Sequence, residues 1–166
     1  NEIKFLKYRE DQFYVSFSMI FQKESINGFK QNGFSNNFQM GFLRDIPLNK
    51  EGDFAIALGL GYSFDKLVSN LNLDNDEQNN LSFSILDNEQ NSQKITSLNL
   101  PLELRWRTST RNKTEFWRLY GGFKYKINLN SRFNYFRGGI SRVSFVRKEN
   151  TAIYISLGYN TWNLLF

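Results

Sequence analysis

A strict alternation of large apolar and polar residues runs through residues 97–107, and it constrains the fold more than any other feature of this chain. Successive side chains of an extended backbone point to opposite faces, so a period of two separates one apolar face from one polar face. A helix would spread the same apolar residues around its whole circumference. The segment therefore predicts a β-strand, and its length matches the roughly 9–11 residues with which a tilted strand crosses a bilayer.

The same rhythm recurs along the chain and predicts six strands in all, at residues 12–22, 34–43, 54–65, 97–107, 115–129 and 151–159. Long polar links (23–33, 66–94 and 130–150) alternate with short ones (45–53 and 108–114), and residues 1–11 form a charged lead-in. Outer-membrane barrels have short periplasmic turns and longer external loops. The pattern thus predicts an all-β protein: a small up-and-down antiparallel transmembrane β-barrel, with the lead-in and the short links in the periplasm.

The number of strands is the open point of this prediction. Single-chain bacterial barrels have about eight strands or more, whereas six are clearly visible here. We expect eight in the complete protein. The remaining two follow Phe166 and are missing from this chain, or residues 81–86 and 140–147 supply them. Residues 1–166 form a single domain in either case, as their length indicates.

The alternation alone does not decide which face meets lipid, because a soluble lipocalin-like barrel shows the same pattern turned inside out. Three features favour an apolar face in lipid. Small residues share the polar side of residues 54–65, where a narrow barrel is crowded. The polar side mixes charges of both signs, and the aromatic residues Trp106, Trp117, Phe116 and Tyr62 lie near predicted strand ends, as in interfacial girdles. The predicted lipid-facing residues are Leu98, Leu100, Leu102, Leu104, Trp106 and Trp117.

The polar side of the predicted strands carries one cluster of candidate functional residues, namely Glu103, Arg105, Arg107, Arg118, Lys124 and Lys126. Eight strands leave an interior just wide enough for side chains. We therefore expect the cluster to form a salt-bridged plug, in preference to a charged lumen that passes or binds an anion.

Composition limits the chemistry that is available to the chain. The sequence has no cysteine and no histidine, which removes disulfides, thiolate metal sites and histidine-assisted nucleophiles. We expect no catalytic residue, no metal and no cofactor. The net charge of +5 comes from basic residues that alternate within strands or lie in turns, so we also expect no nucleic-acid partner.

Several sequence runs resemble the PorT-like outer-membrane β-barrel family of Bacteroidota. They are QNGFS at 31–35, GFLRDIPLNK at 41–50, LGLGY at 58–62, PLELRWRTST at 101–110, FWRLYGGFK at 116–124 and GYNTWN at 158–163. The resemblance implies an outer-membrane protein tied to type IX secretion and gliding motility, without catalytic residues. It also implies two further strands after the last of these runs.

Together these observations predict a non-enzymatic accessory subunit of a larger outer-membrane complex, with type IX secretion as the implied system. The expected partners are outer-membrane lipid, lipopolysaccharide, and other outer-membrane or periplasmic subunits. We expect export by a cleaved signal peptide that is absent from this chain. The alternatives are a small porin, a barrel that binds ions or small molecules, and a soluble lipocalin-like binding module.

Overall fold

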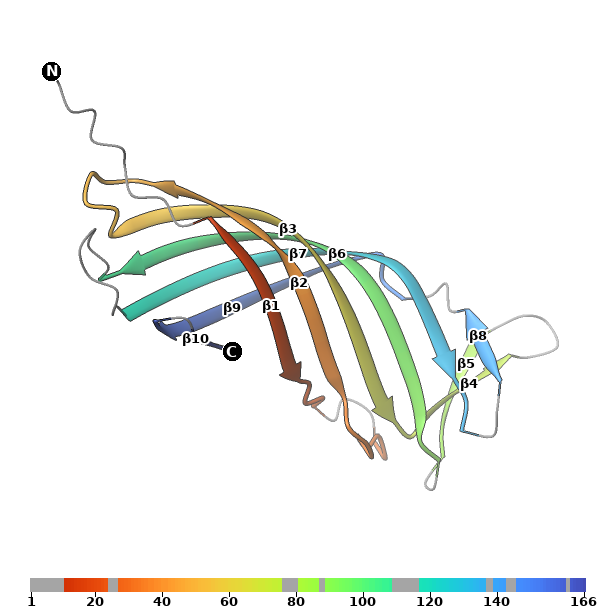
Figure 1. The fold of residues 1–166 in the computed structure, drawn as a ribbon. Helices are drawn as coiled ribbons and strands as arrows, with labels where there is room; N and C mark the ends of the chain where they lie inside the picture. The colour runs from red at the N-terminus through yellow and green to blue at the C-terminus, as the bar shows by residue number, and fades with distance from the viewer. Residues whose placement is uncertain are drawn as a thin grey trace, which may run out of the picture.

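The computed structural model describes residues 11–23, 27–75, 81–86, 89–108, 117–136, 139–142, 146–160 and 162–166. Seven strands follow one another in the main sheet, and each pairs antiparallel with its neighbours. In sheet order they are β1 (Gln12–Met19), β2 (Asn36–Pro47), β3 (Phe54–Ser69), β6 (Asn91–Arg107), β7 (Trp117–Asn134), β9 (Glu149–Tyr159) and β10 (Trp162–Leu165). Figure 1 shows this sheet strongly twisted and curved into a nearly closed barrel. The predicted fold class is confirmed.

The remaining strands lie beyond one end of the main sheet (Figure 1). Strand β4 (Leu71–Asn75) pairs with β5 (Leu81–Ile85) in a separate hairpin, and β8 (Ile140–Arg142) pairs with the last residues of β7. Leu73 and Phe133 form a small apolar cluster at this end, with Tyr135 and Val146 packed against it. The expectation that residues 81–86 supply a barrel strand is therefore wrong, because β5 pairs outside the main sheet. Of residues 140–147, β8 joins the main sheet only along the last three residues of β7, and residues 143–145 lie outside the described part of the chain.

Four predicted strand bounds fall short of the structure, one of them the end of β2, which continues to Pro47. Strand β3 continues to Ser69, β6 begins at Asn91, and β7 continues to Asn134, so the links predicted at 66–94 and 130–150 are shorter than expected and partly folded. The prediction ended these strands where apolar side chains give way to polar ones. The ladder itself continues, because backbone hydrogen bonds between neighbouring strands do not depend on side-chain polarity. Most of the predicted lead-in and of the 108–114 link, namely residues 1–10 and 109–114, lies outside the described residues.

Strand β10 is a seventh barrel strand that the alternation did not reveal. Asn160 adopts a left-handed conformation with φ of 56° in the turn after β9, and Trp162 then pairs back with Tyr159. Asparagine tolerates this conformation better than most residues, which fits a tight reversal. The ladder extends to Phe166, whose backbone exchanges two hydrogen bonds with Ile155.

The apolar face of the sheet points outward and the polar face points inward. Leu104 is 64% exposed, whereas its neighbour Arg105 is 2% exposed. On β3, Ala55, Ala57 and Ser63 are buried inside, while Leu58, Leu60 and Tyr62 are exposed. This arrangement is the reverse of a soluble lipocalin-like barrel, whose interior is apolar. Among the described residues, no helix is long and apolar enough to cross a membrane.

Candidate functional site

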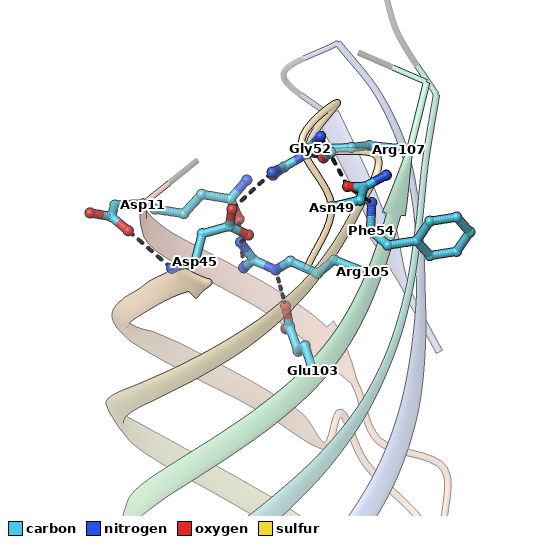
Figure 2. A network of polar contacts seen from close by, with 9 residues as sticks. Asp11, Asp45, Asn49, Gly52, Phe54, Glu103, Arg105 and Arg107 are labelled. Atoms are coloured by element: carbon cyan, nitrogen blue, oxygen red, sulfur yellow. Dashed lines mark hydrogen bonds and ion pairs between the residues drawn. The ribbon is translucent and has the colours of Figure 1, made fainter. Parts of the chain in front are cut away.

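A buried network of ion pairs occupies the barrel interior near the short turn between β2 and β3 (Figure 2). Asp45 of β2 accepts hydrogen bonds from Arg105 at 3.1 Å and from Arg107 at 2.8 Å, and none of these three side chains is exposed. Strand β3 lies between β2 and β6, and its residue between Asp45 and Glu103 in the register is Ala57. Since alanine has a short side chain, the long side chains of β6 reach over β3 to those of β2.

Arg105 connects more strands than any other residue of this network. Its guanidinium donates to Glu103 at 2.9 Å and to Gln12 of β1 at 3.1 Å, and it lies 4.8 Å from the centre of the Tyr120 ring of β7. Glu103 in turn accepts a hydrogen bond of 2.7 Å from the Tyr154 hydroxyl of β9. The network therefore crosses the interior from the first strand of the sheet to the sixth.

The turn between β2 and β3 is tied to the network by backbone and side-chain hydrogen bonds. Arg107 donates from Nε to the Gly52 carbonyl oxygen at 2.7 Å. The side-chain oxygen of Asn49 accepts from the backbone N–H of Gly52 at 3.0 Å and from that of Phe54 at 3.2 Å (Figure 2). Gly52 has a φ of 81°, which favours glycine. The turn thus closes this end of the barrel against the buried ions.

A second polar group lies farther along the interior, toward the β4–β5 end. Lys126 of β7 pairs with Asp65 of β3 at 2.7 Å, and Asp65 also accepts a hydrogen bond of 2.5 Å from Asn37 of β2. Lys124 donates to the Gln39 side chain at 2.7 Å, and its ammonium group lies 4.8 Å from the centre of the Tyr154 ring. The lysine charges are therefore paired or placed over an aromatic face.

Two interior tyrosines occupy slots that glycines leave open. A Cβ atom at Gly61 would lie 2.3 Å from the Tyr14 hydroxyl oxygen, and one at Gly41 would lie 2.7 Å from the same atom. A Cβ atom at Gly122 would lie 2.1 Å from the Tyr154 ring. The alternation of glycine with bulky residues therefore makes room for aromatic rings inside the barrel.

All six residues of the predicted cluster lie on the inner face, but they do not form one group. Glu103 and Arg105 contact each other, and Arg107 joins them through Asp45. Arg118 donates to the Asn160 carbonyl oxygen in the turn before β10. The two lysines belong to the second polar group described above.

Sequence reasoning missed Asp45, the acceptor that joins two of the arginines. It was assigned to the 45–53 link, because Pro47 argues against continued strand pairing. In the structure, β2 continues through Pro47. Asp45 therefore points into the barrel, as do the alternate residues Asn37, Gln39 and Leu43. Extending the alternation of residues 34–43 by two positions would have placed Asp45 in the interior.

The predicted lipid-facing residues lie on the outer face, although the girdle is only partly as expected. Trp106 and Trp117 are exposed and lie at the ends of β6 and β7. Tyr62 lies in the middle of β3 rather than near its end, because β3 continues to Ser69. Phe116 lies outside the described residues.

A cavity of about 690 Å³ lies between the two edges of the sheet. Its lining includes the interior residues Arg118, Lys124 and Tyr154, and also Val15 of β1 and Trp162 of β10. Strands β1 and β10 therefore border the same cavity from opposite sides. The interior is thus ionic and filled near the β2–β3 turn, and open along the seam between β1 and β10.

Comparison with known proteins agrees with this architecture. No match to the chain was found among curated proteins or among solved structures. A family model described as an outer membrane protein beta-barrel domain matches residues 2–166, which is nearly the whole sequence. An ionic interior, an apolar outer face and antiparallel strands long enough to cross a bilayer are the features of such a domain. The chain therefore belongs to the outer membrane protein β-barrel domain family, and its place is the outer membrane.

Proposed function

We propose that this barrel is a non-conducting, non-enzymatic accessory subunit of a larger outer-membrane complex. The observation that carries the proposal is the network around Arg105, which links β1, β2, β6, β7 and β9 across the interior. A barrel of about eight strands has an interior that its own side chains can largely fill, and here the remaining cavity lies along the seam between β1 and β10. The buried ion pairs at the β2–β3 end support an interior that does not conduct.

The seam between β1 and β10 supports the role of a subunit. Neighbouring strands alternate in direction, so the first and seventh strands of the sheet run the same way. One strand that runs in the opposite direction, from a longer form of this chain or from another subunit, fits between them and makes an even, fully antiparallel barrel. Within hydrocarbon every backbone polar group needs a partner, and added strands satisfy open sheet edges in many complexes.

We propose the type IX secretion system as the complex, on the strength of the motif resemblance at 41–50, 101–110 and 116–124. Deletion of the gene is expected to abolish secretion of type IX cargo proteins and gliding, and re-expression of the wild-type chain is expected to restore both. Intact secretion and gliding in the deletion strain would contradict the assignment to type IX secretion. The assignment as an outer-membrane barrel would still stand.

Crosslinking at the seam tests the subunit role directly. The sequence has no cysteine, so single cysteines introduced in cells are unambiguous attachment points. V15C on β1 and L164C on β10 are exposed sites on the edge strands, and L104C is an equally exposed control on the central strand β6. Crosslinked partner proteins are expected from the two edge sites. Equal yields from all three positions would contradict a seam that binds a partner.

Planar-bilayer recordings separate this proposal from the porin alternative. The wild-type protein is expected to give no single-channel currents with either chloride or potassium as the permeant ion. Reproducible conductance steps that disappear when the protein is omitted would contradict a filled interior and favour a porin.

A further inference from the structure

Three basic residues lie side by side on the outer face of the sheet, one on each of three neighbouring strands. Lys66 of β3 is the register partner of Lys94 of β6, and Lys94 is the register partner of Arg132 of β7. All three are exposed. The backbone register continues the row to Arg142 of β8. We call Lys66, Lys94 and Arg132 the basic row.

Among the described residues, no carboxylate neutralises the positive charges of the basic row. Like charges directly opposite each other on neighbouring strands destabilise a sheet. No ion pair within the described part of the chain joins Lys66, Lys94 or Arg132 to a carboxylate. The nearest acidic residue in sequence, Asp65, faces inward and pairs with Lys126. An external anion that lies across the three strands would relieve this repulsion.

The basic row lies at one border of the apolar outer surface. Apolar residues occupy the alternate outward positions of β3 from Phe54 to Phe64, all of them exposed except the half-buried Ile56, and Lys66 is the next outward position. The adjoining row toward the membrane contains Phe64, Thr96 and Asn130. This order matches the layers of a membrane: the apolar band lies in hydrocarbon, the row with hydroxyl and amide groups lies at the interface, and the row of cations lies among the headgroups.

This border belongs to the external side of the membrane. The β4–β5 hairpin connects β3 to β6 at this end, and β8 lies in the long connection from β7 to β9. The short turn of residues 48–53 lies at the opposite end. Long connections are external in outer-membrane barrels and short turns are periplasmic. The basic row therefore lies at the level of the outer-leaflet headgroups.

We propose that Lys66, Lys94 and Arg132 bind the phosphate groups of an anionic lipid in the outer leaflet. Neighbouring strands lie about 4.8 Å apart, so the three cations span a width of about 10 Å along the membrane surface. Lysine and arginine carry long apolar stems that lie along the band while their charged ends reach the headgroups. Arginine adds a planar fork that matches phosphate oxygens.

The test uses the purified full chain in dodecyl maltoside, with diphosphorylated lipid A as the probe and native mass spectrometry as the readout. The K66Q/K94Q/R132Q variant is expected to bind the probe on the order of a hundredfold more weakly than wild type, from the usual contribution of each basic residue near an anionic surface. The charge-conserving variant K66R/K94R/R132K is expected to bind as wild type does.

K50Q is the matched control, because Lys50 is an exposed lysine in the turn at the periplasmic end. It is expected to leave lipid binding unchanged. Lipid A from which both phosphates have been removed is expected to bind weakly and equally to wild type and to all variants. Equal binding of the phosphorylated probe to wild type and to the triple variant would overturn the proposal. Displacement of the lipid by equimolar inorganic phosphate would also overturn it, in favour of a free-anion site.

A second readout separates loss of the site from loss of the fold. Without lipid, K94Q is expected to unfold at the same temperature as wild type or at a higher one, since it removes repulsion from the centre of the row. With diphosphorylated lipid A, wild type is expected to gain thermal stability and K94Q to gain less. An equal gain in both proteins would contradict the assignment.

Discussion

Asp45 and Arg105 lie 60 residues apart in the sequence and meet inside the barrel in an ion pair of 3.1 Å that no solvent reaches. Burying either charge alone costs several kcal/mol, and mutual attraction offsets this only with good geometry and further hydrogen bonds. Arg107 supplies a second donor to Asp45, and Glu103 supplies a second acceptor to Arg105 (Figure 2). The pair is therefore part of a network that holds β2 against β6 across β3.

Replacing Asp45 with asparagine is expected to lower the free energy of unfolding by about 3–5 kcal/mol, because two buried guanidinium groups lose their shared carboxylate. Urea unfolding in detergent, followed by tryptophan fluorescence, measures the change. R44Q is the control, since it removes an ion pair with Asp11 in which the arginine side chain is 54% exposed. That pair is expected to contribute less than about 1 kcal/mol. Equal effects of the two substitutions would show that the buried network does not hold the strands together.

The sequence predicts the alternating faces well, because a period of two survives in the barrel strands except in the short β10 and at the register shift of β7 opposite Thr96 and Ser97. It predicts less well where strands end. Pro47 lies at the last position of β2, where it is compatible with pairing, so treating it as a break hid Asp45. Beyond the apolar band, Lys66 and Lys94 keep pairing with no apolar signal to mark them. The cavity depends on how far the sheet curves, and no local pattern encodes that curvature.

Replacing Leu102 with arginine tests the lipid-facing side. Leu102 is 43% exposed and lies in the middle of the apolar run of β6. An arginine near the bilayer midplane is expected to cost about 2–4 kcal/mol. Folding into lipid vesicles, followed by urea titration, measures this loss. L102M keeps an apolar side chain of similar volume and is expected to change stability by less than about 1.5 kcal/mol. Wild-type stability for L102R would mean that this face does not meet hydrocarbon.

Replacing Arg105 with leucine is expected to destabilise the barrel by a different route. Leucine is apolar, but it leaves Glu103 without its 2.9 Å partner and Asp45 with one arginine in place of two. The expected loss is again about 3–5 kcal/mol. The double variant E103Q/R105L is expected to recover part of it, because the uncompensated carboxylate is gone. Strict additivity in this double-mutant cycle would contradict a coupling between the two residues.

The adjacent glycines of β7 offer the closest matched comparison in the chain. A Cβ atom at Gly122 would meet the Tyr154 ring at 2.1 Å, whereas one at Gly121 would meet nothing within 4 Å. G122A is expected to displace Tyr154 from Glu103 and to cost about 1–3 kcal/mol through overpacking. G121A is expected to change stability by less than about 0.5 kcal/mol, as is usual for open outer positions.

A double-mutant cycle tests whether Tyr154 causes the expected loss of stability in G122A. If the added methyl group contacts the Tyr154 ring, G122A should lower the free energy of unfolding much less in a Y154A background than in wild type. The reason is that Y154A removes the ring from the space beside Gly122. The free energies of unfolding of G122A, Y154A and the double variant give this coupling directly. If G122A lowers the free energy of unfolding by the same amount in the Y154A background, the loss comes from the β7 backbone and not from the tyrosine. In that case, the difference in stability between G122A and G121A would no longer show which face of β7 points into the barrel.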